Sequence, residues 1–180
     1  MTQIDFSNLP TDGESLFNLA QEYKVTVESM EGGRMIAKLI IRAAELDYPE
    51  AQFELSSYYA KGAFVEKDLS LALRWSTAAA NNGCTAAQRD MGIKAYEGFA
   101  GECDFEEAIK WFSMADDLGD IESKSWLGAM HIEGKGFLEN ASLGHSLISW
   151  AAKNGCKKAH LELAYMYEFG TDVILIDTDR

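Results

Sequence analysis

Glycines recur in this chain at a fixed interval of 36 residues, and this periodicity constrains the fold more than any other feature. One series is Gly83, Gly119 and Gly155, and a second is Gly62, Gly98, Gly134 and Gly170. An apolar series keeps the same interval, at Leu19, Leu55, Met91, Leu127 and Leu163, as does a small-residue series at Ser15, Ala51, Ala87, Ser123 and Ala159. Residues of the same kind would not recur by chance at one interval over so many copies, so the sequence predicts an array of structural repeats.

Each repeat is predicted to contain two helices. Apolar residues are spaced three or four apart within a copy, as at Leu69, Ala72 and Trp75, and a glycine follows each run where a left-handed C-cap would lie. The predicted repeats are 11–46, 47–82, 83–118 and 119–154, with a half repeat at 155–170. The first helix of each is predicted over 14–24, 50–60, 86–97, 122–132 and 157–168, and the second over 32–45, 68–82, 104–118 and 140–154.

Charge excludes several classes of partner. The 180 residues include 29 Asp and Glu against 16 Lys and Arg, a net charge of −13 that repels phosphate backbones and anionic lipid surfaces. The longest apolar run of note is Val173–Ile176, far too short to cross a membrane. We therefore expect no nucleic-acid partner, no membrane insertion and, with no basic leader at the N-terminus, a cytoplasmic location.

Three stretches are similar to the repeats of a known family: Ala43–Leu46, Glu50–Asp68 and Ala72–Trp75. Together they resemble the Sel1-like repeat (SLR) family, a relative of the tetratricopeptide repeat. The resemblance continues through 84–119, is looser through 120–155, where Gly144 and Leu147 replace the usual Ala and Trp, and persists in 159–170. It implies an all-α fold, a right-handed α/α superhelical solenoid, whose first helices line a concave face used for protein–protein contact.

The resemblance also implies which side chains face that groove. By analogy with tetratricopeptide repeats, they are Phe17, Gln21, Lys24, Glu50, Phe53, Ser57, Lys61, Arg89, Ile93, Tyr96, Glu97, Glu122, Ser125, Ile132, Glu133, Lys158, Leu161, Tyr165, Glu168 and Phe169. Their mixture of aromatic rings and carboxylates is typical of a binding surface. The alternative is that several of the rings belong to the core between repeats.

A cluster of acidic residues adjoins this set. Glu97, Glu102, Asp104, Glu106 and Glu107 lie within eleven residues that contain no base, and we call them the acidic edge. One interpretation is that they steer a cationic partner toward the groove. The other is that Asp104, Glu106 and Glu107 only stabilise the start of the following helix by opposing its dipole; both can hold together.

The sequence contains little evidence for a catalytic site, a metal site or a disulfide. Cys84 and Cys156 occupy the same position two repeats apart, roughly 20 Å at ordinary helix spacing, which is too far for a disulfide. Cys156 and His160 could share a helix face, but no pattern supplies the further ligands that zinc needs. Gly144–Ile148 lacks the closing glycine of a nucleophile elbow. We therefore predict no cofactor, no metal and no catalytic residues.

Two tryptophans and the C-terminal segment depart from the repeat pattern. Trp126 and Trp150 fall where other copies carry different residues, Trp126 at the position of Glu54, so each is either an interface anchor or a space filler near Gly128 and Gly144. For Trp126 we favour filling, and Trp150 stays open. Residues 171–180 are predicted to form a cap in which Val173–Ile176 folds back over the last helix, because an open solenoid end exposes core.

These observations predict a non-enzymatic, monomeric, single-domain module that binds one cationic protein through the groove and the acidic edge. A compact acidic protein that neutralises a basic toxin, as an immunity protein does, fits its charge and size. The alternative is a regulatory adaptor or scaffold that binds a peptide or helix in the same groove. A hydrolase is the third hypothesis.

Overall fold

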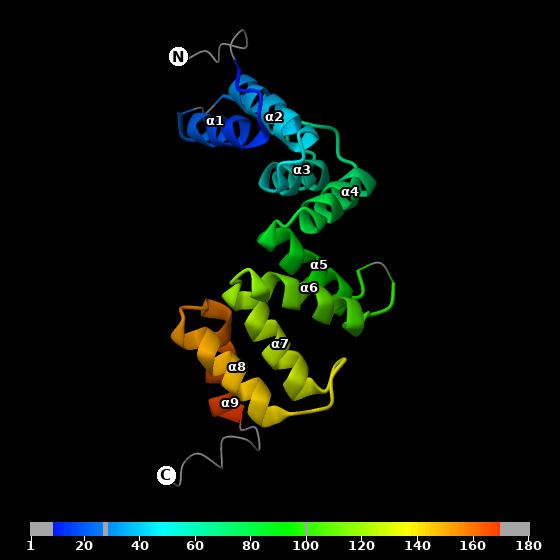
Figure 1. Cartoon of the computed structure of the whole chain (residues 1–180), viewed down its shortest axis with the longest axis vertical. Coiled ribbons are helices and arrows are strands. Elements are labelled where there is room, and N and C mark those ends of the chain that lie inside the picture. Colours follow the sequence, from blue (N-terminus) through cyan, green and yellow to red (C-terminus); the bar gives the residue numbers. More distant parts are fainter. Residues whose placement is uncertain (1–8, 27–28, 100, 170–180) are drawn as a thin grey trace. The chain divides into compact units, whose positions relative to one another are not determined.

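A computed structural model describes residues 9–26, 29–99 and 101–169. Within these ranges the chain forms nine α-helices and no strand (Figure 1). The helices are α1 (Gly13–Thr26), α2 (Met30–Glu45), α3 (Pro49–Lys61), α4 (Leu69–Asn81), α5 (Thr85–Glu97), α6 (Phe105–Asp117), α7 (Ile121–Glu133), α8 (Ala141–Lys153) and α9 (Lys157–Phe169). All nine predicted helices are confirmed, each with ends within two residues of the prediction.

Local capping explains where the helices begin and end. Asp68 precedes α4, and its Oδ1 accepts hydrogen bonds from the backbone N–H groups of Ser70 and Leu71, both at 2.9 Å. Asp104, Asp120 and Asn140 cap α6, α7 and α8 in the same way. Gly62 and Gly134 end α3 and α7 with φ of 69° and 65°, a conformation that costs glycine little.

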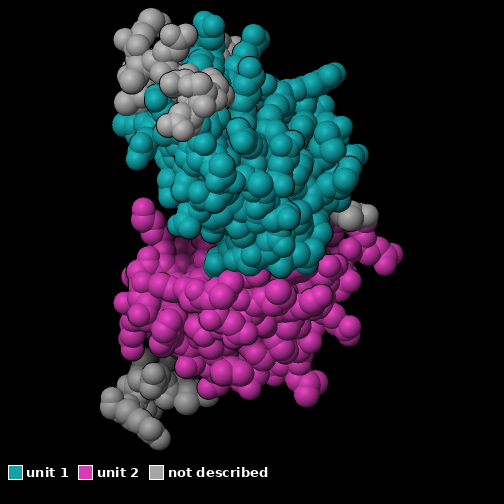
Figure 2. Space-filling model, turned by 45° about the horizontal axis from the view of Figure 1, so that its top comes forward, with its two compact units in different colours: residues 1–87 teal, residues 88–180 magenta. Residues whose placement is uncertain are grey.

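The chain divides into two compact units, residues 1–87 and 88–180, which Figure 2 colours separately. Each is described by itself. No helix among the described residues is long and apolar enough to cross a membrane. The predicted cap at Val173–Ile176 lies outside the described residues.

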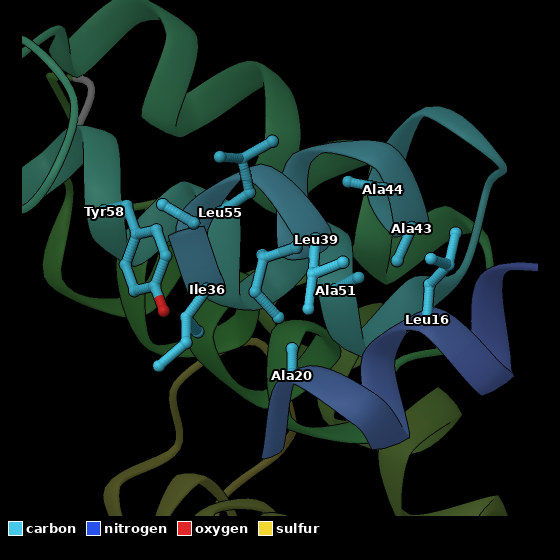
Figure 3. Close-up of a cluster of buried hydrophobic side chains, with 11 residues drawn as sticks. Leu16, Ala20, Ile36, Leu39, Ala43, Ala44, Ala51, Leu55 and Tyr58 are labelled. Carbon is cyan, nitrogen blue, oxygen red and sulfur yellow. The ribbon is translucent and has the colours of Figure 1, made fainter. Parts of the chain in front are cut away.

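The core of unit 1 lies between α1, α2 and α3. Figure 3 shows leucine and alanine side chains from these helices meeting in one cluster, among them Leu16, Leu39, Ala51 and Leu55, each fully buried or nearly so. Ala51 and Leu55 belong to the repeating series of the sequence. Alanines at such contacts let the helix backbones approach closely, while the leucines fill the remaining space.

A buried polar side chain links three segments of unit 1. Gln52 donates from Nε2 to the Ala44 carbonyl at 3.2 Å and to Asp47 Oδ1 at 3.1 Å, and its Oε1 accepts from Asn82 Nδ2 at 2.9 Å. The amide is therefore bonded on both sides, which offsets the cost of burying it.

Two clusters of buried side chains lie among the described residues of unit 2. Ala108 and Phe112 of α6 pack with Met130 of α7, and Trp126 stacks on Phe112 with ring centroids 5.5 Å apart and planes 5° apart. Trp126 therefore packs against the core, as the space-filling interpretation expected, but the predicted place beside Gly128 and Gly144 is wrong, because the ring lies against Phe112. In the second cluster, Ile148 of α8 packs with residues of α9.

The helices α7 and α8 touch backbone to backbone. A Cβ atom added to Gly128 would lie 2.9 Å from the Gly144 carbonyl oxygen, and one added to Gly144 would clash with the Gly128 carbonyl. No void is therefore left where Gly144 replaces the usual alanine. Trp150 does not fill this space: it is 46% exposed, and Lys124 Nζ lies 5.1 Å from its ring.

Candidate protein-interaction surface

In unit 1, most of the predicted groove residues lie along α1 and α3. Phe17 packs against Tyr48 with centroids 5.3 Å apart and belongs to the edge of the core. Phe53 and Ser57 are half-buried on α3, and Glu50 is exposed at its start. Of these four, only Glu50 is exposed, and Phe17 is partly buried against the core, which favours the alternative interpretation for this ring.

A polar cluster joins α1 to α3. Glu54 accepts from Gln21 Nε2 at 2.8 Å and from the Tyr58 hydroxyl at 2.5 Å, and it forms an ion pair with Lys24. Burial and the adjacent Glu54 carboxylate both raise the pKa of Tyr58 well above its usual range. Sequence reasoning missed Glu54, although the residue shares a repeat position with Glu162 of α9.

In unit 2, Arg89 and Glu122 come together as predicted residues of neighbouring helices. Arg89 Nε lies 3.7 Å from Glu122 Oε2, and its guanidinium also pairs with Asp120. Ile93 of α5 is half-buried against the core that contains Phe112. The charge of Arg89 is therefore neutralised within the unit.

Tyr96, Glu133 and Lys135 form a triad at the ends of α5 and α7. The Tyr96 hydroxyl donates to Glu133 Oε2 at 2.5 Å, and Lys135 Nζ lies 2.8 Å from each of the two oxygens. Burial raises the pKa of Tyr96. Burial also acts to raise the pKa of Glu133, but the hydrogen bonds from Lys135 and Tyr96 outweigh it and hold that pKa below its usual value.

Ser125 departs from the prediction. Its side chain is fully buried, and its hydroxyl donates to Glu162 Oε2 at 2.5 Å. The reason is that α9 packs against this side of α7 and covers it. Ser125 therefore serves the contact between α7 and α9 and is not a surface residue that a partner could reach.

A hollow of about 420 Å³ lies between α7, α8 and α9, and we call it the α7–α9 groove. It is lined by Ala129, Ile132, Glu133, Ile148, Lys158, Leu161, Glu162, Tyr165 and Met166. The predicted groove residues that the structure brings together here are Ile132, Glu133, Lys158, Leu161 and Tyr165. Leu161 and Tyr165 are 73% and 66% exposed, while Ile148 and Met166 form a buried floor.

Lys158 is the basic residue of the lining, and it is held in place. It forms an ion pair with Glu162 and lies over the Trp126 ring with Nζ 4.0 Å from the centroid. Burial lowers the pKa of this lysine. Glu162, Ile148 and Met166 are lining residues that the prediction omitted; the repeat position shared by Glu54 and Glu162 was the available signal.

All five residues of the acidic edge are exposed. Asp104 Oδ1 accepts from the Glu107 backbone N–H at 2.9 Å, and Glu107 Oε1 accepts from Trp111 Nε1 at 3.1 Å. The helix-stabilising interpretation is therefore confirmed for Asp104. Glu97, Glu102 and Glu106 have no ion pair within the described part of the chain, and Glu168 on α9 is also exposed.

Within the described ranges, no three His, Cys, Asp or Glu residues are placed to hold a metal ion. Cys84 and Cys156 are buried and Cys103 is exposed, all three as free thiols. His160 Nδ1 lies 2.9 Å from the Cys156 carbonyl oxygen, and the Cys156 sulfur accepts from the Ala159 N–H at 3.4 Å. This pair thus has structural partners at the start of α9.

Comparison with known proteins bears on this surface. The family model for the Sel1 repeat matches residues 49–84, 85–120 and 157–180, which is more than half of the chain. A Sel1 repeat protein from Oxalobacter formigenes superposes with a TM-score of 0.77 at 24% identity, over 88% of this chain and 64% of its own. The protective antigen c5321 of uropathogenic Escherichia coli, which displays an SLR fold, gives 0.73 at 27% identity, over 89% and 34%.

Immunity protein Pa5087 from Pseudomonas aeruginosa has a TM-score of 0.60 at 22% identity, over 91% of this chain and 62% of its own. This chain therefore spans less than two thirds of each of these three proteins. The likenesses confirm the predicted fold class, an all-α helical repeat solenoid.

Proposed function

Because this chain belongs to the Sel1 repeat family, whose members generally mediate protein–protein interaction, we propose that it is a module that binds a basic protein partner. Sel1 repeats are typically non-catalytic scaffolds, and the proposed action is binding alone. The binding surface comprises the faces of α5, α7 and α9 in unit 2, together with the acidic edge. The module acts as a monomer in a reducing, cytoplasmic compartment, where the exposed Cys103 thiol stays reduced.

The distribution of charge carries this proposal. Six basic side chains, those of Lys24, Arg89, Lys94, Lys124, Lys135 and Lys158, form ion pairs with carboxylates of the chain. Glu97, Glu102 and Glu106, in contrast, are exposed carboxylates that lie within ten residues of one another in the sequence. Such a field attracts a cationic surface and raises association rates by about 10 to 10³-fold at low salt.

Neutralisation of a basic toxin is the specific role that we propose. Its support is the net charge of −13 and the likeness of fold to an immunity protein of Pseudomonas aeruginosa. The second candidate is an adaptor that binds a peptide or helix, and the apolar floor of the α7–α9 groove favours it. The two differ in salt dependence, because apolar burial is screened little by ions.

The test begins with affinity capture from native extract at low and moderate salt. The baits are the wild-type protein, a Glu97→Lys/Glu102→Lys/Glu106→Lys variant and a control of equal charge change, Glu45→Lys/Glu66→Lys/Glu139→Lys, whose residues are also exposed. A basic protein held by the wild type is then purified and titrated against all three. We expect the acidic-edge variant to bind at least tenfold more weakly and the control to bind nearly as well as the wild type. Equal affinities for all three would refute the electrostatic surface.

A further inference from the structure

We propose that the α7–α9 groove is an anchor site that receives one bulky apolar side chain of the partner with a basic side chain next to it. This inference rests on the proposed function and names the chemistry that the partner must present. According to this inference, most of the apolar contact with the partner is made by a few residues of unit 2.

The apolar half of the site is built from three helices. Leu161 and Tyr165 are one turn apart on α9 and stand exposed, while Ala129 and Ile132 of α7 and Ile148 of α8 line the opposite side. A hollow of about 420 Å³ accommodates a leucine or phenylalanine side chain with room for part of its neighbour. Filling it would remove apolar surface of Leu161 and Tyr165 from water, which favours binding.

The rim of the groove favours a cation. Its charged lining is Glu133, Glu162 and Lys158, and Lys135 pairs with Glu133 from outside the lining. With the exposed Glu168, three carboxylates lie at this rim against two ammonium groups. Lys158 is directed to the Trp126 ring and paired with Glu162, which makes it a poor partner for an incoming anion. Glu133 remains 42% exposed despite its contact with Lys135, and Glu168 is exposed one turn beyond Tyr165.

Charge also discriminates between the possible occupants. A second copy of this chain would bring another net charge of −13 to an acidic rim, and like charges disfavour that contact. The cap predicted at Val173–Ile176 is flanked by Asp172 and Asp177, so seating it in the groove itself would bring like charges to the acidic rim. A basic segment of a different protein complements both the floor and the rim.

Defined peptides test this inference directly. The probe is a capped pentapeptide with one phenylalanine flanked by two arginines, and its matched partners replace the phenylalanine by alanine or both arginines by glutamates. Each is titrated into ¹⁵N-labelled full-length protein, and amide shifts are followed by NMR. We expect saturable shifts at Leu161 and Tyr165 with the probe, and binding at least tenfold weaker with either matched peptide.

Variants of the protein complete the test. Leu161→Asp and Tyr165→Ala are each expected to weaken probe binding at least tenfold, whereas Leu138→Asp, at a 92% exposed position outside the groove lining, leaves it unchanged. Circular dichroism melting verifies that each variant is folded. The Tyr165→Ala variant keeps the test decisive if Leu161→Asp disrupts α9.

Three results would overturn the anchor site. One is the absence of saturable shifts, or equal shifts with arginine and glutamate peptides. Another is a dimer, detected by light scattering, that Leu161→Asp dissolves, since a second copy would then be the occupant. The last is faster amide exchange of residues 170–180 in Leu161→Asp, which would assign the groove to the chain itself.

The purified basic partner separates this inference from the proposed function. If its affinity falls with the acidic-edge variant but not with Leu161→Asp or Tyr165→Ala, the anchor site is wrong and the electrostatic function stands. If neither set of variants changes the affinity, both are wrong.

Discussion

The helix pairs α3–α4 and α7–α8 share one architecture but achieve close packing with different residues. The family model matches the first pair and not the second. On α4 the repeat places Ala72 and Trp75 toward its neighbours, and on α8 the same positions hold Gly144 and Leu147. The second pair compensates by bringing Gly144 against Gly128 on α7.

The connections of the two pairs are alike. Gly62 and Gly134 both adopt the left-handed conformation, and the residue that caps the next helix donates its N–H back to the preceding one, from Asp68 to Tyr59 at 3.0 Å and from Asn140 to His131 at 2.8 Å. Local capping therefore defines the connection within each helix pair. The residues at the contact between the two helices can vary, provided that their total volume fits the space between the helices.

The repeat position shared by Glu54 and Trp126 shows how a change of residue alters the candidate binding surface. Glu54 on α3 accepts hydrogen bonds from Gln21 and Tyr58, while Trp126 at the same position of α7 stacks on Phe112 and contacts Lys158. A polar cluster in one repeat is thus replaced by an aromatic one in another. The aromatic cluster supports Lys158 at the α7–α9 groove.

The largest effect is expected where the aromatic cluster is removed. Phe112→Ala should lower the free energy of unfolding by about 3–5 kcal/mol, because the ring is fully buried and supports Trp126. Urea denaturation followed by circular dichroism measures it, with Leu118→Ala at an exposed position as the control. A loss below about 1 kcal/mol would mean that this cluster contributes little to unit 2.

The second largest effect is expected when the residues at the equivalent positions 72 and 144 are exchanged. Gly144→Ala should destabilise the protein by about 1–3 kcal/mol, since the added methyl group meets the Gly128 backbone. Ala72→Gly, the reverse exchange in α4, should cost about 1–2 kcal/mol, because it lowers helix propensity and removes a buried methyl group. Ser146→Ala, exposed on α8, is the control. Stabilisation by Gly144→Ala would show that the backbone contact does not limit the packing.

The shared caps should respond alike. Asp68→Ala and Asn140→Ala are each expected to cost about 1 kcal/mol, because each removes the acceptor for N–H groups at the start of a helix. Thermal melts of both variants measure this, with Ser70→Ala as a nearby exposed control. A loss confined to one variant would contradict a common connection.

The smallest effect concerns pH. The lowered pKa of Glu133 means that its charged form stabilises the folded chain above the ordinary carboxyl pKa of 4.5, and that this stabilisation is lost as the pH falls through the folded value. Glu133→Gln should therefore be less stable than the wild type at pH 6, by less than about 1 kcal/mol. The difference should shrink toward pH 3; a constant difference would exclude titration of Glu133 as its source.

The sequence by itself determined the nine helices, their order and nearly all their ends. This was possible because caps, glycines and apolar spacing are local signals that act within one or two turns. It also located Leu161, Tyr165 and Glu133, which the α7–α9 groove brings together. The acidic edge followed from the position of its five acidic residues within eleven residues that contain no base.

Only the tertiary structure decided which side chains of a helix face stay accessible. Neighbours on a helix differ by about 100° in direction, so periodicity places Ser125 near the predicted face but cannot show that α9 covers it. The contact of Gly128 with Gly144 likewise depends on two helices at once. Whether a side chain is accessible, and how closely two backbones approach, depends on how two helices pack together. The sequence repeat predicts where each helix begins and ends, but it does not predict that packing.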